Sequence, residues 1–129
     1  MQTENTAASP MKVAIVGASN DRSKYGNRAL RGFKAAGYSV YPVNPNCTEV
    51  EGLPCYPDLA SLPVKPDIIT VYTPPRVSAA LVPQIAKIGA AEVYFNPGSE
   101  DEEVMRLAKQ YNVAAIFACS VLARAFFAD

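Results

Sequence analysis

Residues 12–19 read Lys-Val-Ala-Ile-Val-Gly-Ala-Ser, and this stretch decides the fold class. Its apolar run is typical of a buried strand, and Gly17 ends that run at a turn of small residues. Parallel α/β sheets place such a turn between their first strand and first helix, because glycine lets backbone N–H groups approach a ligand and the helix N-terminus attracts an anion. The stretch therefore predicts a parallel α/β sheet with an anion-binding first turn, with a plain strand-to-helix turn as the alternative.

Short apolar runs alternate with helical stripes along the rest of the chain, as in repeated strand-helix units. The expected strands cover residues 12–17, 39–43, 67–72, 92–95 and 113–118. The expected helices cover residues 24–36, 76–88 and 99–111, with a short one within 120–129. We predict an α/β fold in one domain, residues 11–129: a Rossmann-like, doubly wound, mainly parallel sheet with helices on both faces. Residues 1–10 are expected to be a disordered leader.

Single positions add local expectations. Pro83 should kink or split the second helix, because an interior proline costs about 3 kcal/mol. Ser99 and Glu102 have the spacing of a helix-capping box. Gly52 marks a turn, with a very short strand near residues 54–56. The inward faces of the first two helices should comprise Tyr25, Ala29, Leu30, Phe33 and Ala36, then Val77, Leu81, Ile85 and Ile88. The final helix should pack Val121, Leu122 or Phe126 on the sheet.

Composition and charge exclude several classes of protein. Half of the residues are hydrophobic and 19% are charged, which is ordinary for a globular protein. The net charge is zero, but residues 1–50 hold six Lys and Arg against three Asp and Glu. This excess surrounds the glycine turn and is too small for a nucleic-acid surface. No apolar run approaches the ~18 residues of a membrane span, and the polar start is unlike a signal peptide.

The potentially reactive side chains in the sequence do not indicate catalysis. The chain has no histidine, which excludes His-based metal sites, Ser-His and Cys-His pairs and phosphohistidine chemistry. Its three cysteines lack metal-type spacing and suit a reducing cytoplasm, where we expect the protein to reside. Cys119 is expected to be a buried small residue rather than a nucleophile. We predict no catalytic residue and no metal site.

The predicted strands end in polar and proline-containing segments, at residues 17–19, 44–45, 72–74 and 96–98. In an open parallel sheet these carboxyl ends share one edge, where ligands bind near the point at which strand order reverses. Three of the four segments contain proline and are therefore stiff. This edge is expected to form a trough for a long, flexible ligand.

The turn matches a dinucleotide fingerprint poorly. Glycines would be needed at positions 17, 19 and 22, where the chain has Gly17, Ser19 and Arg22. Asn44 stands where an acidic residue would accept from a ribose hydroxyl. NAD is therefore disfavoured, and NADP is supported only by Arg22 and Lys24.

Longer patterns resemble a known family. They are Val-x-Ile-Val-Gly-Ala-Ser at 13–19, Gly-Tyr-x-Val-x-Pro-Val-Asn-Pro at 37–45, Gly-x-x-x-Tyr-x-x-Leu at 52–59 and Asn-Pro-Gly-Ser-x-x-Glu at 96–102. Together they resemble the small single-domain CoA-binding proteins, related in fold to the N-terminal domain of the succinyl-CoA synthetase α subunit. The resemblance implies a Rossmann-type sheet whose first turn and helix hold the CoA pyrophosphate. It also implies relatives that pass phosphate through a histidine, which this chain lacks.

The resemblance carries binding roles to particular positions. The phosphate turn would comprise Gly17, Ala18, Ser19, Asn20 and Arg22. The adenosine would be flanked by Asn44 and Pro45. The path of the pantetheine arm would be lined by Tyr72, Thr73, Pro74, Asn96 and Pro97. Lys24 and Tyr25 complete the expected binding set at the start of the helix. Arg22, Lys24 and Arg28 would supply the cations that pyrophosphate and a 3′-phosphate need. Tyr72 would either stack on adenine or plug the end of its strand.

The expected function is binding of CoA or an acyl-CoA by a non-catalytic binding or regulatory module. One alternative is an NAD(P)-binding sensor domain. Another is a CoA-binding component of an acyl-CoA synthetase that needs a partner chain. The expected ligand is a small nucleotide, with no nucleic acid or membrane partner, and the sequence identifies no protein partner.

Overall fold

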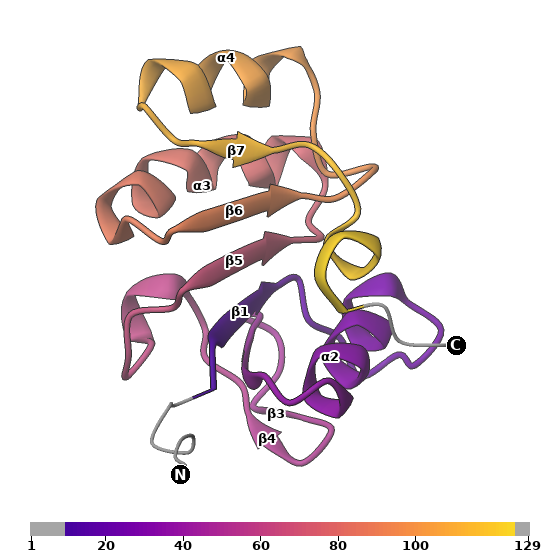
Figure 1. The fold of residues 1–129 in the computed structure, drawn as a ribbon. Helices are drawn as coiled ribbons and strands as arrows, with labels where there is room; N and C mark the ends of the chain where they lie inside the picture. The colour runs from indigo at the N-terminus through magenta and orange to yellow at the C-terminus, as the bar shows by residue number, and fades with distance from the viewer. Residues whose placement is uncertain (1–9, 126–129) are drawn as a thin grey trace, which may run out of the picture.

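The computed structural model describes residues 10–125. Its main sheet has five parallel strands in the order β2-β1-β5-β6-β7 (Figure 1). These strands are β1 (Lys12–Val16), β2 (Ser39–Val43), β5 (Ile68–Val71), β6 (Glu92–Phe95) and β7 (Ala115–Ile116). The helices are α2 (Tyr25–Ala35), α3 (Pro75–Ile88), α4 (Glu102–Gln110) and two short ones, η1 (Leu59–Ser61) and η2 (Val121–Ala125). A small antiparallel hairpin, β3 (Glu49–Val50) and β4 (Leu53–Pro54), follows β2.

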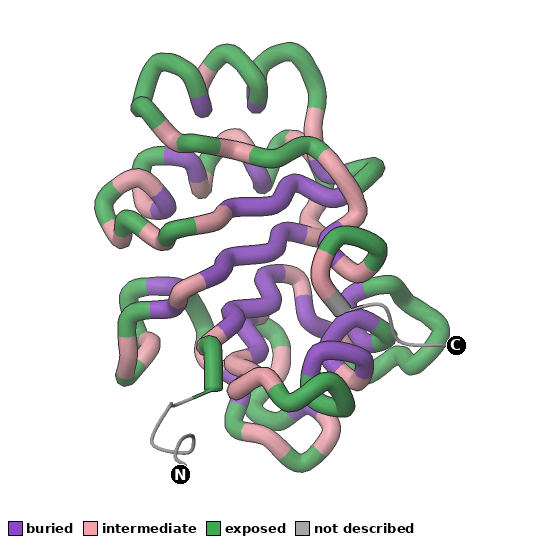
Figure 2. The backbone as a smooth tube through the Cα atoms, in the orientation of Figure 1, coloured by how far each residue is buried: buried purple, intermediate pink, exposed green. Residues whose placement is uncertain are grey.

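The alternation of side chains along each strand creates two apolar cores. Val13 and Ile15 of β1 pack with Leu30 and Phe33 of α2 on one face of the sheet. Ala14 and Val16, together with alternate residues of β5 and β6, pack with Val82 and Ile85 of α3 and Val104 of α4 on the other face. Figure 2 shows the central strands buried along most of their length. The α/β, doubly wound, Rossmann-like fold with helices on both faces is confirmed.

The strand order reverses between β1 and β5. From β1 the chain passes through α2 to β2 on one side, and then crosses to β5 on the other side of β1. Helices that follow strands on opposite sides of this point cover opposite faces, so they leave a crevice outside the carboxyl ends of β1 and β5. The ends are tied together because Gly17 N donates to the Val43 carbonyl (3.0 Å) and Tyr72 N to the Val16 carbonyl (2.8 Å).

A buried polar network fixes the floor of this crevice. Asn96 Nδ2 donates to Thr70 Oγ1 (2.7 Å) and to the Val71 carbonyl (2.9 Å). Its Oδ1 accepts from Ser120 N (2.8 Å), and the hydroxyls of Thr70 and Ser120 are 2.7 Å apart. One amide therefore joins β5, β6 and the segment after β7, and a buried polar network with all its members paired rigidifies a core.

The structure corrects two predictions about the helices. α3 continues through Pro83 as one helix of 14 residues, so the predicted split is wrong. Pro83 is exposed, whereas Val82 and Ile85 on either side are buried and hold both halves against the sheet. The predicted Ser99–Glu102 capping box is also wrong. Asp101 is the N-cap of α4, and its Oδ1 accepts from Val104 N (3.0 Å).

The last part of the chain differs from expectation in extent. β7 is limited to Ala115–Ile116, although a strand over 113–118 was expected. After it, Phe117 stacks on Phe95 with ring centroids 5.5 Å apart, and the chain leaves the sheet edge to reach the network at Ser120. η2 then packs Val121 against the core on the α2 side, while Leu122 is 71% exposed. Phe126 lies outside the described residues.

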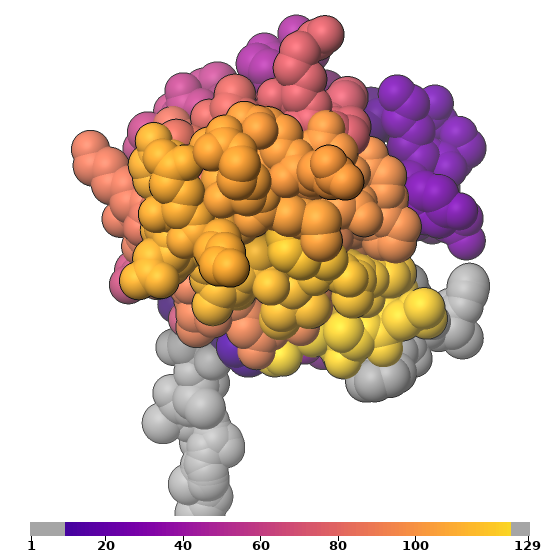
Figure 3. All heavy atoms as spheres, turned by 90° about the horizontal axis from the view of Figure 1, so that it is seen from above, coloured from indigo at the N-terminus to yellow at the C-terminus, as the bar shows by residue number. Residues whose placement is uncertain are grey.

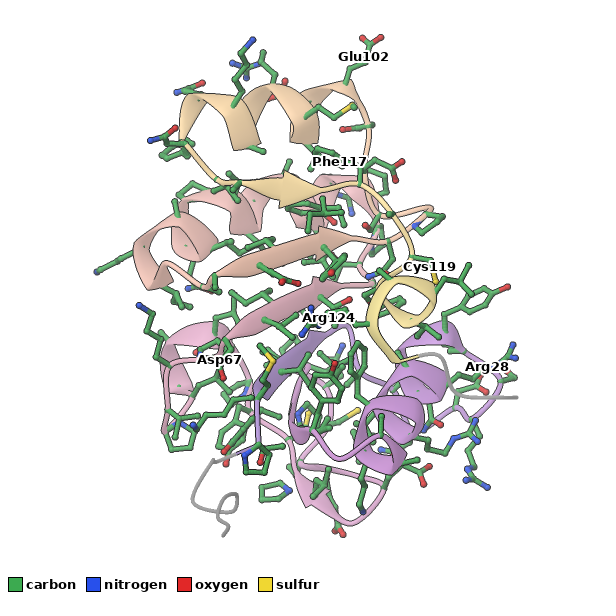
Figure 4. The ribbon with its side chains drawn as sticks, in the orientation of Figure 1. Arg28, Asp67, Glu102, Phe117, Cys119 and Arg124 are labelled. Carbon is green, nitrogen blue, oxygen red and sulfur yellow. The ribbon has the colours of Figure 1, made fainter. Side chains whose placement is uncertain are left out.

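Arg124 fastens η2 to the sheet. Its Nη1 lies 3.2 Å from Glu92 Oε2 at the start of β6, and its guanidinium lies over the Tyr38 ring at 5.9 Å. Figure 4 shows Arg124 pointing from η2 into the layer between α2 and the sheet. The segment after the edge strand therefore returns to cover the α2 face.

Candidate functional site

A cleft of about 960 Å³ opens at the carboxyl ends of the strands. Its lining comes from the turn after β1, the start of α2, the segment after β2, η1, and the starts of α3 and α4. The volume lies at the upper end of the range of about 300–1,000 Å³ typical of small-molecule sites. The lining combines prolines and other apolar residues with serines, asparagines and Lys24.

Two glycines allow the backbone of the turn to lie close to its neighbours. Gly17 has a φ of +90°, which L side chains rarely adopt, and a Cβ there would lie 3.0 Å from the Tyr72 carbonyl carbon. A Cβ on Gly26, in the first turn of α2, would meet the Gly17 carbonyl oxygen at under 3.0 Å. α2 therefore starts in direct contact with the turn, a packing that only glycine permits.

Asp21 and Asn44 hold the turn in place. Asp21 Oδ1 accepts from Ser23 N (3.0 Å) and from Ser23 Oγ (2.6 Å), and Lys24 N donates to the Asp21 carbonyl (3.0 Å). These hydrogen bonds from Ser23 lower the pKa of Asp21. Asn44 Nδ2 donates to the Ala18 carbonyl (2.6 Å), while Asn44 Oδ1 accepts from Asn46 N (2.7 Å). The turn is thus rigid before any ligand arrives.

The N-terminus of α2 opens into the cleft. Its N-cap, Lys24, makes no side-chain capping hydrogen bond, so the first N–H groups of the helix are left for another acceptor. Lys24, Tyr25 and Gly26 all line the cleft. Among the described residues of the lining, Lys24 is the one cation. A helix N-terminus and a lysine together form a site for an anion such as a phosphate group.

The comparisons with known proteins agree with this geometry. Residues 11–124 match the model of a family described as a CoA binding domain. The chain belongs to the CoA binding domain family. The resemblance seen in the sequence is therefore confirmed, together with the kinship to the CoA-binding part of larger ligases.

Relatives of this CoA binding domain occur alone and within larger proteins. It is 26% identical over 117 residues to an ADP-forming acetate–CoA ligase of Archaeoglobus fulgidus, covering 83% of this chain and 17% of the ligase. A conserved hypothetical protein from Pyrococcus furiosus is 35% identical with a TM-score of 0.80, covering 88% of this chain and 98% of that one. A dinucleotide-forming acetyl-coenzyme A synthetase from Ca. Korarchaeum cryptofilum, in complex with phosphate and ADP, is 31% identical with a TM-score of 0.72. The present chain covers 26% of that synthetase.

Most of the predicted binding residues of the CoA binding domain line the cleft. These are Gly17, Ser19, Lys24, Tyr25, Asn44, Pro45, Tyr72, Thr73, Pro74 and Pro97. Ala18 is buried, and it contributes its backbone to the turn. Asn96 is 2% exposed and belongs to the polar network beneath the floor. Asn20 Nδ2 donates to the Glu49 carbonyl (2.9 Å) on the β3–β4 hairpin.

Arg22 lies outside the cleft lining. Its Nε is 3.2 Å from Glu51 Oε2, and that carboxylate also accepts from Asn27 Nδ2 (3.0 Å). The hydrogen bond from Asn27, followed by the charge of Arg22, lowers the pKa of Glu51. Arg31 Nε donates to Asn27 Oδ1 (2.7 Å) and extends the cluster along α2. Two of the four basic residues near the turn are therefore directed toward the hairpin.

Tyr72 plugs the end of β5. Its hydroxyl lies 3.1 Å from Ser120 Oγ, and the side chain packs against the core on the α2 side. Burial raises the pKa of Tyr72. Of the two roles expected from the sequence, the structure supports the plug.

The lining of the cleft also includes residues that the sequence analysis assigned to the core or did not select. Val77 was expected to face inward but is 39% exposed and lines the cleft, next to Leu81 one turn later. Tyr25, which was expected both on the inward face of the first helix and in the binding set, is 72% exposed and lines the cleft. Gly26 was not selected, although a glycine in the first turn of the first helix was a signal for close packing. Described residues beyond the predicted set that also line the cleft include Ser23, Asn46, Pro57, Asp58, Leu59, Gly98 and Ser99.

Within residues 10–125, no three His, Cys, Asp or Glu side chains gather as they would around a metal ion. In the same residues, no helix is long and apolar enough to cross a membrane.

Proposed function

We propose that this chain binds CoA or an acyl-CoA in the cleft and acts as a binding or regulatory module that does no chemistry itself. The observation that carries the proposal is the uncapped N-terminus of α2, with Lys24 beside it, opening into the cleft at the strand-order switch point. The pyrophosphate would accept hydrogen bonds from the first N–H groups of α2 and pair with Lys24. Family membership independently favours CoA as the ligand.

The lining of the cleft offers positions for the rest of the ligand. The adenosine would lie near Asn44 and Pro45 at the end of β2, and the pantetheine arm would pass Thr73, Pro74 and Pro97 toward the start of α4. Asn44 offers no carboxylate to a ribose diol, and its amide is already bonded to the Ala18 carbonyl and to Asn46 N. CoA would therefore engage both halves of the cleft, whereas NAD shares the adenosine and pyrophosphate but has no pantetheine arm for the second half.

A comparison of ligands tests the proposal. Saturating CoA and acetyl-CoA should raise the melting temperature alike and more than NAD, NADP or ATP at the same concentration. A ligand that binds only the folded state stabilises it by about 2.7 kcal/mol at a hundredfold excess over Kd. A larger shift with NAD or NADP would refute the assignment of ligand, and native mass spectrometry would show directly which ligand the purified protein carries.

The curated relatives favour a second candidate function. Several are ADP-forming acetate–CoA ligases, and this chain spans about a sixth of the length of the first of them. The chain would then be the CoA-binding component of an acyl-CoA synthetase that needs a partner chain. Incubation of this chain alone with labelled ATP, an acyl acid and CoA should give neither labelled protein nor thioester under either candidate. Thioester formation on adding a partner chain would favour the second.

A further inference from the structure

The basic residues at the start of α2 fall into two pairs. Arg22 pairs with Glu51, and Arg31 donates to Asn27 Oδ1 and to the Arg22 carbonyl (3.1 Å), so both are committed to the hairpin side. Lys24 and Arg28 have no ion-pair partner among residues 10–125. The charges of this second pair are therefore available to a ligand.

Arg28 lies against an aromatic ring that itself lines the cleft. Its Cζ lies 5.6 Å from the centroid of the Tyr25 ring, one helical turn before it, and Tyr25 itself lines the cleft. Figure 4 shows Arg28 extending outward from α2, on the side toward which the strands point, and Figure 3 shows this part of the chain projecting from the body of the molecule. Stacking orients the guanidinium but leaves its N–H donors free, which suits bidentate binding of a phosphate.

CoA presents two separate anionic groups, the pyrophosphate and the 3′-phosphate of its ribose. In the proposed function the N-terminus of α2 and Lys24 hold the first, which leaves the described lining of the cleft without a cation for the second. The ribose would lie near Asn44, at the end of the strand beside β1, on the α2 side of the switch point. Arg76, at the start of α3, belongs instead to the side expected for the pantetheine arm.

We propose that Arg28, oriented by the Tyr25 ring, binds the 3′-phosphate of CoA and makes the cleft selective for CoA over 3′-dephospho-CoA. This inference rests on the proposed function and adds a specificity-determining pair to it. A phosphate held by a guanidinium forms charge-assisted hydrogen bonds, which correspond to about tenfold to a hundredfold in affinity.

The test crosses protein variants with the two ligands. Isothermal titration calorimetry would measure the Kd of CoA and of 3′-dephospho-CoA for the wild type, Arg28→Ala, Tyr25→Ala, Tyr25→Phe and Arg76→Ala. The wild type should bind CoA about tenfold to a hundredfold more tightly than dephospho-CoA. Arg28→Ala should reduce this ratio to within about threefold, chiefly by weakening CoA, while Tyr25→Phe and the matched control Arg76→Ala should keep the ratio. Tyr25→Ala should give an intermediate ratio, because the guanidinium loses its support.

The outcomes separate this inference from the proposed function. If the wild type binds both ligands equally, or if Arg28→Ala weakens both by the same factor, Arg28 does not bind the 3′-phosphate although CoA binding stands. A loss of selectivity in Arg76→Ala instead of Arg28→Ala would also overturn the inference. If neither ligand binds the wild type, the proposed function fails as well. All of the substituted side chains are exposed, so thermal melts of the variants should match the wild type.

Discussion

Replacement of Gly26 by alanine tests whether the contact between α2 and the turn shapes the site. The new Cβ would lie under 3.0 Å from the Gly17 carbonyl oxygen, which is backbone and has no rotamer with which to move away. Either α2 or the turn has to shift. Overpacking of this kind costs about 1–3 kcal/mol, whereas alanine gains about 1 kcal/mol over glycine in a helix.

The net expectation is therefore a loss of about 1 kcal/mol in the free energy of unfolding, or roughly 3–5 °C in melting temperature for a domain of this size. The effect on binding should be larger in proportion, because the shift would move the helix N-terminus relative to the pyrophosphate that it binds in the proposed function. We expect the affinity for CoA to fall at least tenfold, since small misplacements of binding groups are costly.

Thermal unfolding and calorimetric titration with CoA measure the two effects. Ala35→Gly, at the exposed end of the same helix, serves as a control, because it changes helix propensity far from the turn. It should lower the melting temperature slightly and leave the affinity unchanged. If Gly26→Ala instead raised the stability by the full propensity gain with unchanged affinity, the close contact would not constrain the site.

Three further predictions concern single side chains. Lys24→Ala should weaken CoA binding by about 1.5–3 kcal/mol. Arg22→Ala should weaken it by less than about 1 kcal/mol, because the Arg22 side chain pairs with Glu51. Equal losses of affinity by calorimetric titration would contradict this difference between the two residues. Asn96→Ala should lower the free energy of unfolding by about 1–3 kcal/mol, because the buried Ser120 N–H loses its hydrogen-bond acceptor. An unchanged midpoint of denaturant unfolding would contradict this prediction. Because the pKa of Glu51 is lowered in the folded state, its stabilising contribution is present above the unfolded-state pKa and is lost as the pH falls through the folded value. Glu51→Gln should therefore flatten the acid limb of the stability–pH profile, and an unchanged acid limb would rule out this linkage.

The layers of the fold could be predicted because the apolar pattern of each strand matches the way that strand is buried in the sheet. In β1 the apolar run is buried on both faces, and its alternate residues enter the two cores. The paired strand ends followed from topology, since parallel strands place their carboxyl ends on one edge. The prediction for Pro83 was wrong because the free-energy cost of an interior proline applies to a helix considered alone. In this helix, Val82 and Ile85 pack against the sheet and hold both halves in place.

The candidate site was less predictable wherever it depends on contacts distant in sequence. Arg22 was expected to serve the phosphate turn, but the hairpin brings Glu51 to it from 29 residues away. Tyr25 and Val77 belong to apolar helical stripes, and periodicity shows which side of a helix is apolar without showing whether the sheet or a cleft lies opposite. Asp101 displaced Ser99 as N-cap because Ser99 Oγ donates to the Asn96 carbonyl (2.7 Å).

The arrangement of the turn bears on how a site with one cation in its described lining would hold the highly charged ligand of the proposed function. The Gly17 and Asp21 N–H groups are already bonded within the protein, and Asn44 fixes the Ala18 carbonyl, so the turn has little conformational freedom left to lose. Binding to a preorganised site avoids much of the ordering cost that a flexible loop would impose. Affinity would then come from oriented backbone dipoles at the start of α2 as much as from Lys24. It should therefore depend less steeply on ionic strength than binding by a cluster of mobile side chains would.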